Sequence, residues 1–224
     1  LFWDLQILTW PVFLAASGVI TLLWAAYMLG AYKLPYDYER PKPTLKRGVF
    51  AVVLLFLVVS MFRGAADREY KYHGSVLAFL PPADYGLNEF NEHGHKMGAA
   101  HLSWIESYED AFEWAKQHNQ PLFIDFTGVT CVNCRRMEYE IFPHPDVKPL
   151  LEQFTRGELW VDKPPYGAFN TKLQIERFNQ IAQPFYAIID PRNDETLITF
   201  PGYDPNPQKF KEFLQAGLEA YNKK

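Results

Sequence analysis

The stretch of sequence that decides the fold is residues 122–141, which read LFIDFTGVTCVNCRRMEYEI. Leu122–Thr127 is mostly apolar, as expected for a short strand at the centre of a sheet that is covered on both faces. Two cysteines, Cys131 and Cys134, follow this strand, and Arg135–Ile141 is predicted to be a helix. The stretch is therefore a strand, a turn with a C-x-x-C motif, and a helix.

The two cysteines are expected to have different roles in thiol chemistry. Unpaired backbone N–H groups and the helix dipole at the start of a helix stabilise a thiolate at Cys131. The thiolate is the form that attacks a disulfide. Cys134 lies one turn further on, where it can displace the substrate from a mixed disulfide. We therefore predict that Cys131 is the nucleophile, that Cys134 is the resolving thiol, and that no cofactor beyond their disulfide is needed.

The C-x-x-C motif has other interpretations. The chain has 2 cysteines, which suits redox chemistry, half of a metal site or a static disulfide. A static disulfide across so small a loop restricts the unfolded chain little. Imidazole and thioether groups upstream suit copper, so a copper- or zinc-handling or assembly factor that uses the motif with them is the alternative function. These upstream groups, which a flexible polar linker also explains, are His93, His95, Met97 and His101.

Two further residues bear on the cysteine pair. Asp125 is an acid within the apolar strand, and burial would raise its pKa and suit it to moving the proton of the resolving thiol. An exposed acid at a strand edge is the alternative. Pro184 precedes the apolar run FYAIID, where a cis Gln183–Pro184 bond would bring its loop against the cysteines.

The rest of the C-terminal part alternates helices and strands, which predicts an α/β domain over residues 103–224. Turn residues at 191–194 join the last two strands into a hairpin. The predicted helices are 108–118, 169–181 and 207–221, and the predicted strands besides 122–127 are 158–162, 185–190 and 196–200.

The N-terminal part is apolar instead, and residues 1–66 are predicted to be a membrane region. Helices over 7–32 and 48–66 are long enough to span a bilayer, although a buried core helix and a re-entrant helix are the respective alternatives. Residues 67–102 are predicted to be an extracytoplasmic linker. The loop between the helices is basic, which places it in the cytoplasm and the C-terminal domain outside. Its cations are Lys33, Arg40, Lys42, Lys46 and Arg47.

The net charge of −4 argues against a nucleic-acid partner, since phosphate binding requires a basic surface. The expected partners of an outward-facing cysteine pair are disulfide-bearing proteins, because disulfides form in that compartment.

The segment FIDFTGVTCVNCRRME resembles the thioredoxin superfamily and, within it, the C-terminal part of DsbD-type membrane disulfide reductases. KLPYD at residues 33–37 and FLPP at 79–82 also resemble elements of those proteins. The resemblance implies a thioredoxin-like fold, a central mixed sheet flanked by helices, behind two transmembrane helices. It also implies that Asp125 and Glu138 tune the thiols and that Pro184 is a cis-proline that docks partners.

The same resemblance implies an electron relay in the inner membrane of a bacterium. An upstream membrane domain with its own cysteine pair reduces the periplasmic domain, which then reduces partner proteins, including those of cytochrome c biogenesis. The expected partner-binding residues are Thr130, Val132, Asn133, Gln183 and Pro184. Two departures stand out: Thr130 replaces the tryptophan common in thioredoxins, and residues 1–66 contain no cysteine.

The direction of electron flow follows from the residues beside the nucleophile. Val132 and Asn133 place no histidine next to Cys131, so the thiolate is less stabilised and the pair is the more reducing. The positive charges of Arg135 and Arg136 favour the thiolate and so make the pair less reducing, unless both side chains point into solvent. A reductase is therefore expected, with an oxidant or isomerase and a non-catalytic adaptor as the alternatives.

Overall fold

The computed structural model describes residues 9–66 and 90–223. The chain forms two compact units, and the boundary between them in the sequence is after residue 73. Each unit is described by itself. The first residues of the predicted helix at 7–32, most of the predicted linker and the FLPP motif lie outside the described residues.

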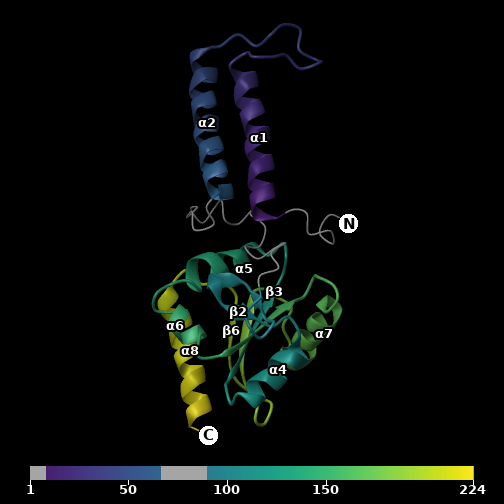
Figure 1. The fold of residues 1–224 in the computed structure, drawn as a ribbon, viewed down its shortest axis with the longest axis vertical. Coiled ribbons are helices and arrows are strands. Elements are labelled where there is room, and N and C mark those ends of the chain that lie inside the picture. The colour runs from purple at the N-terminus through teal and green to yellow at the C-terminus, as the bar shows by residue number, and fades with distance from the viewer. Residues whose placement is uncertain (1–8, 67–89, 224) are drawn as a thin grey trace. The chain divides into compact units, whose positions relative to one another are not determined.

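The N-terminal unit is a pair of packed helices, α1 (Trp10–Met28) and α2 (Leu45–Ala66) (Figure 1). Both are long and apolar enough to cross a membrane by length and composition. They begin and end within a few residues of the sequence expectation. Pro11 lies in the first turn of α1, where a missing N–H costs no helical hydrogen bond.

Close packing joins the two helices. A Cβ on Gly18 would lie 3.1 Å from Cε2 of Phe62, so glycine allows this ring to approach the backbone of α1. Most of the remaining apolar surface is outward and exposed, for example Ile20 and Phe56. An apolar exterior around a small buried seam is what a helix pair needs in a lipid solvent.

The C-terminal unit is built on a four-stranded sheet with the order β4-β3-β5-β6. β3 pairs with β4 in parallel and with β5 antiparallel, and β5 and β6 form an antiparallel hairpin. The mixed sheet of the expected thioredoxin-like fold is therefore present. The strands are β3 (Leu122–Thr127), β4 (Thr155–Trp160), β5 (Phe185–Asp190) and β6 (Glu195–Pro201).

Helices cover both faces of this sheet (Figure 1). Alternate residues of β3 divide between two apolar cores, with Phe123 in one and Leu122, Ile124 and Phe126 in the other. The core around Phe123 is covered by α8 (Pro207–Asn222) and by the helix after the cysteines. The other core is covered by α4 (Tyr108–Gln117) and α7 (Gly167–Phe178). Both faces of β3 and β5 are thus buried, which explains their unbroken apolar sequence.

The segment before residue 103 belongs to the folded unit. β1 (Lys96–Met97) pairs with β2 (Ser103–Trp104), and η1 (Ala99–His101) lies between them. Ala99 and Leu102 are buried in the core around Phe123. Ile105 then bridges to Gly157, which extends the sheet beyond β4. The part of the expected linker that is described, 90–102, is therefore packed against the domain.

The helix after the cysteines is less regular than expected. It consists of α5 (Val132–Arg136) followed by a π-helical turn, η2 (Met137–Ile141), in which the N–H of Phe142 donates to the carbonyl of Met137 at 2.9 Å. A short helix, α6 (Lys148–Leu151), also precedes β4 and has no counterpart in the sequence expectation. Its four residues are too few to show a helical period.

Candidate active site

The C-x-x-C loop and Pro184 lie at the same edge of the sheet. β3 ends at Thr127, and the loop to Cys131 starts there. Phe126 is opposite Phe185 in the antiparallel ladder of β3 and β5, so Pro184 follows opposite Thr127. The Gln183–Pro184 bond is cis, as the family resemblance implies. The fold therefore brings the predicted cysteines and the predicted proline to one edge.

Cys131 and Cys134 form a disulfide with Cα atoms 5.3 Å apart. Cys131 occupies the N-cap of α5, and its Sγ accepts the backbone N–H of Cys134 at 3.1 Å. Cys131 is half-buried, whereas Cys134 is fully buried. The surface therefore offers an incoming reagent the sulfur of Cys131 and withholds that of Cys134.

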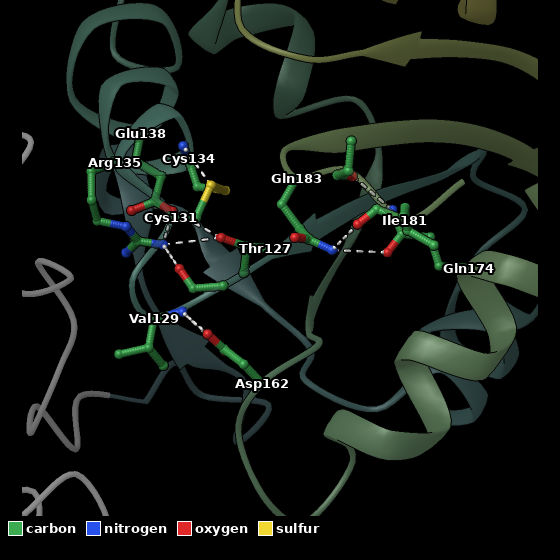
Figure 2. The surroundings of a disulfide bond; sticks show 12 residues. Thr127, Val129, Cys131, Cys134, Arg135, Glu138, Asp162, Gln174, Ile181 and Gln183 are labelled. Carbon is green, nitrogen blue, oxygen red and sulfur yellow. Dashed lines mark hydrogen bonds and ion pairs between the residues drawn. A yellow bond between two sulfur atoms is a disulfide. The ribbon is translucent and has the colours of Figure 1, made fainter.

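The turn before Cys131 is tied to the end of β4. Both carboxylate oxygens of Asp162 accept the backbone N–H of Val129, at 3.0 and 2.9 Å (Figure 2). A Cβ on Gly128 would lie 3.2 Å from Oδ2 of Asp162, so glycine leaves room for this contact. Asp162 thereby holds the backbone that presents Cys131.

Beneath α5 lies a buried ion pair. The Nη2 of Arg135 is 2.7 Å from Oε1 of Glu138, and both side chains are almost wholly buried. The same Nη2 donates to Oγ1 of Thr127 at 3.0 Å (Figure 2). The guanidinium also lies 5.3 Å from the ring centre of Trp160. The option that Arg135 points into solvent is wrong, because Glu138 and Thr127 hold it against the sheet.

Asp125 is buried on the sheet face that α5 covers. It is 1% exposed, so the alternative of an exposed strand-edge acid is wrong. Burial, and secondarily the charge of Glu158, raise the pKa of Asp125 well above its usual value, while Arg135 opposes this shift. The raised pKa favours the protonated form of this carboxyl group.

Cys134 and Glu138 lie on the side of the helix that packs against this face of the sheet. Cys134, Met137, Glu138 and Ile141 are all buried and lie three, four and seven residues apart, the spacing of one helical face. Met137 and Ile141 pack in the core with Phe123 of β3. Cys134 thus faces the part of the sheet that carries Asp125.

The predicted partner-binding residues divide by exposure. Thr130, Val132 and Asn133 are exposed around Cys131. Gln183 is half-buried and donates to the carbonyl of Ile181 at 2.8 Å and to Oε1 of Gln174 at 3.3 Å (Figure 2). Pro184 is buried, and its carbonyl accepts the N–H of Gly202 at 2.8 Å. The first three therefore present exposed side chains beside Cys131, and the side chain of Gln183 is partly exposed.

Arg136 takes part in a second, more exposed cluster. Its Nη2 is 3.3 Å from Oε2 of Glu140, and its guanidinium lies 4.2 Å from the ring centre of Tyr203. The hydroxyl of Tyr203 donates to the same Glu140 oxygen at 2.8 Å. The turn after β6 is in this way fixed to the helix of the cysteines.

The upstream histidines pack against an aromatic side chain. The rings of His93 and His95 lie 5.2 and 4.3 Å from that of Trp114 on α4. Burial lowers the pKa of His95. Within residues 9–66 and 90–223, no three His, Cys, Asp or Glu side chains come close enough together to hold a metal ion.

Three residues of the site are not identified as site residues by the sequence pattern: the buried Arg135, Glu158 and the tether Asp162. Glu158 and Asp162 stand in the expected strand ELWVD, and an acid in a strand expected to be buried is a usable signal. Their contacts depend on the register between β3 and β4, which a single sequence does not show.

Residues 103–191 match the family model described as thioredoxin-like. Comparison with curated proteins gives no match. Solved structures with similarity include a thioredoxin from Thermus thermophilus, at 24% identity and a TM-score of 0.45, over 53% of this chain and 89% of that one. The reduced DsbD C-terminal domain of Neisseria meningitidis has 18% identity and a TM-score of 0.40, over 49% and 92% of the respective chains.

A third similar structure is a DsbH oxidoreductase, at 21% identity and a TM-score of 0.40, over 58% of this chain and 92% of that one. The family match and the observed mixed sheet agree with each other. This part of the chain is a thioredoxin-like domain, and it carries a Cys131–Cys134 disulfide.

Proposed function

We propose that this chain is a membrane-anchored protein-disulfide reductase, in which Cys131 attacks a partner's disulfide and Cys134 resolves the product. The observation that carries the proposal is the asymmetry of the cysteine pair. Cys131 is half-buried at a helix start with its sulfur on a backbone N–H, and Cys134 is fully buried one turn below. An attacking thiol needs access and a stabilised thiolate, whereas a resolving thiol needs no access to solvent and loses its proton only as it attacks.

The exchange proceeds in two steps. The Cys131 thiolate bonds to one sulfur of the partner's disulfide, and the other sulfur leaves as a thiolate that takes a proton from water. Cys134 then gives its proton to the Asp125 carboxylate, bonds to the Cys131 sulfur and releases the partner's remaining thiolate. The partner gains two electrons and the cysteine pair loses two. The Cys131–Cys134 disulfide is the sole redox group in this scheme.

Two acids accompany these thiols. Asp125 exchanges the proton of Cys134, for which a carboxyl group with a raised pKa is suited. Glu138 pairs with Arg135 at 2.7 Å, and its negative charge offsets a guanidinium that would otherwise stabilise the thiolate and make the cysteine pair less reducing. Partners dock on the exposed residues around Cys131, with Thr130, Val132 and Asn133 the contacts and the cis-proline loop of Gln183 and Pro184 beside them.

The rest of the proposal concerns location. The helices α1 and α2 anchor the chain in the lipid of a bacterial inner membrane, with the basic loop in the cytoplasm and the thioredoxin-like domain in the periplasm. The reduced state is regenerated by an upstream membrane donor that has its own cysteine pair. Disulfide-bearing periplasmic proteins, including those of cytochrome c biogenesis, receive the electrons.

A trapping experiment tests the exchange. The reduced full chain, solubilised in detergent, is mixed with insulin as a disulfide substrate and analysed on non-reducing gels. We expect Cys134→Ser to accumulate a mixed disulfide through Cys131, because nothing resolves it, and Cys131→Ser to form none. A Cys131→Ser chain that reduces insulin as fast as the wild type would refute the assignment.

The orientation is tested by labelling intact cells with a membrane-impermeant maleimide. Lys42→Cys on the basic loop and Glu219→Cys on α8 are placed in a chain without native cysteines. We expect the second to be labelled in intact cells and the first only after lysis. The reverse pattern would place the domain in the cytoplasm.

A further inference from the structure

A second buried acid lies beside Asp125. Asp125 of β3 and Glu158 of β4 are directly opposite each other in the parallel ladder, and they are 1% and 2% exposed. Residues opposite each other in a sheet project to the same face. Two carboxyl groups thus share one buried environment under the helix of Cys134, where both cannot readily be charged.

The hydrogen bonds indicate which acid carries the proton. The indole Nε1–H of Trp160 donates to Oε2 of Glu158 at 2.9 Å, which favours the ionised form of Glu158. The Oδ1 of Asp125 is buried with no hydrogen-bond partner among the described residues, a position that suits a neutral carboxyl group. The geometry therefore assigns the charge to Glu158 and the proton to Asp125.

The other groups around Asp125 do not change this assignment. Arg135 on α5 opposes the effect of Glu158, but its guanidinium is already within 2.7 Å of Glu138 on η2. Tyr186 lies opposite Asp125 on β5, and burial raises the pKa of its hydroxyl well above the usual value, so it is neutral. The surroundings thus combine one guanidinium, two further carboxyl groups and a neutral phenol.

We propose that Glu158 is a positioning residue for the thiol chemistry, because its charge holds a proton on Asp125 for delivery to the Cys134 sulfur when the disulfide opens. The inference rests on the proposed thiol–disulfide exchange and adds to it a residue that acts through Asp125. In the opposite half of the cycle, the same charge makes the Asp125 carboxylate a stronger base toward the Cys134 thiol.

The proposed step is a proton transfer coupled to disulfide opening. A thiolate of the electron donor bonds to the Cys131 sulfur, and the Cys131–Cys134 bond breaks with its electron pair on the Cys134 sulfur. Asp125 gives its proton to that sulfur and becomes a carboxylate. The proton transfer leaves a neutral thiol at Cys134. A thiolate there would be costly, because the buried site has no solvent to stabilise its charge.

The test is the pH dependence of disulfide opening in the oxidised full chain in detergent. The rate with dithiothreitol, corrected for the thiolate fraction of this reagent, is measured for the wild type and variants. In the wild type we expect the corrected rate to fall as rising pH removes the proton from the acid pair. We call this part of the pH–rate profile the limb, and we expect Asp125→Asn to abolish it. In Glu158→Gln we expect the limb about one pH unit lower, or roughly tenfold slower opening within it.

Matched variants separate charge from structure. Glu158→Asp keeps the charge and restores the limb, and Glu176→Gln, an exposed acid of α7, leaves it unmoved. Circular dichroism shows first that each variant is folded. If Glu158→Gln does not fold, Glu158→Met, which removes the charge without leaving an amide to satisfy, carries the same expectation.

Failure of this inference differs from failure of the proposed function. Three results would each overturn the role of Glu158. Glu158→Gln could leave the limb where it is in the wild type, Glu158→Asp could displace the limb as far as Glu158→Gln does, or the wild type could show no limb at all. The trapped Cys131 mixed disulfide would still form in all three cases. Loss of that trapped species would refute the exchange itself.

Discussion

Replacing Arg135 with methionine tests whether the buried ion pair under α5 holds the site together. The Arg135 and Glu138 side chains are 2% and 3% exposed, and 2.7 Å separates Nη2 from Oε1. Arg135→Met leaves the Glu138 carboxylate buried without this cation and removes the donor 3.0 Å from Oγ1 of Thr127. Breaking one side of such a pair costs about 3–5 kcal/mol of folding free energy.

The neighbouring Arg136 provides a matched control. Its ion pair with Glu140 has side chains that are 35% and 27% exposed, so water screens the attraction. We expect Arg136→Met to cost about 0–1 kcal/mol for this pair, and about 0.5–1 kcal/mol more for the lost stacking on Tyr203. The double variant Arg135→Met/Glu138→Gln should recover part of the loss, because no buried charge is left unpaired.

Thermal unfolding of the full chain in detergent, followed by near-ultraviolet circular dichroism, measures these effects. For a domain near this size, 1 kcal/mol lowers the midpoint by roughly 2–4 °C, so Arg135→Met should lower it by roughly 6–20 °C. Arg136→Met should lower it by a few degrees. If both variants shift the midpoint equally, the buried pair does not hold the site together.

Three further predictions concern single side chains. The folded-state pKa of Asp125 is raised, so its stabilising contribution is full below the unfolded value of about 3.9 and is lost as pH rises toward the folded value. Unfolding titrations should therefore show Asp125→Asn gaining stability over the wild type as pH rises, and a pH-independent difference would contradict this. The folded-state pKa of His95 is lowered, so folding stability is lost as pH falls below about 6.5. His95→Gln should remove part of that loss between about pH 7.5 and 5.5. Parallel stability curves for the wild type and the variant would contradict this. Asp162→Ala should cost about 0.5–1.5 kcal/mol and change the rate of disulfide opening, whereas Glu152→Ala, before the start of β4, should leave that rate unchanged.

The central elements of the fold are readable from the sequence because their burial is uniform. Leu122–Thr127 and Phe185–Asp190 are strands with the predicted bounds, since each is an apolar run covered on both faces. The sequence predicts β4 at 158–162, but the strand begins at Thr155 and ends at Trp160. Its first residues carry no apolar run, and their extended form comes from pairing with Leu122–Ile124.

The candidate site is only partly readable for a related reason. The local pattern identifies Cys131, Cys134 and Asp125, because a strand, a turn and a helix are consecutive in sequence. The burial of Arg135 depends on a π-helical turn and on a contact with Thr127 at the end of β3, and neither is marked by a sequence period. The pairing of Asp125 with Glu158 depends on the register of parallel strands that are far apart in the chain.

The reduction potential of the Cys131–Cys134 couple tests the central claim most directly. The full chain is equilibrated in glutathione or dithiothreitol buffers, and thiol labelling of the wild type is compared with that of Cys131→Ser and Cys134→Ser. A reductase requires a reversible couple at about −200 mV or lower, on the scale where thioredoxin lies at about −270 mV. A potential of about −120 mV would contradict the direction of electron flow, and the absence of a reversible couple would contradict thiol–disulfide exchange altogether.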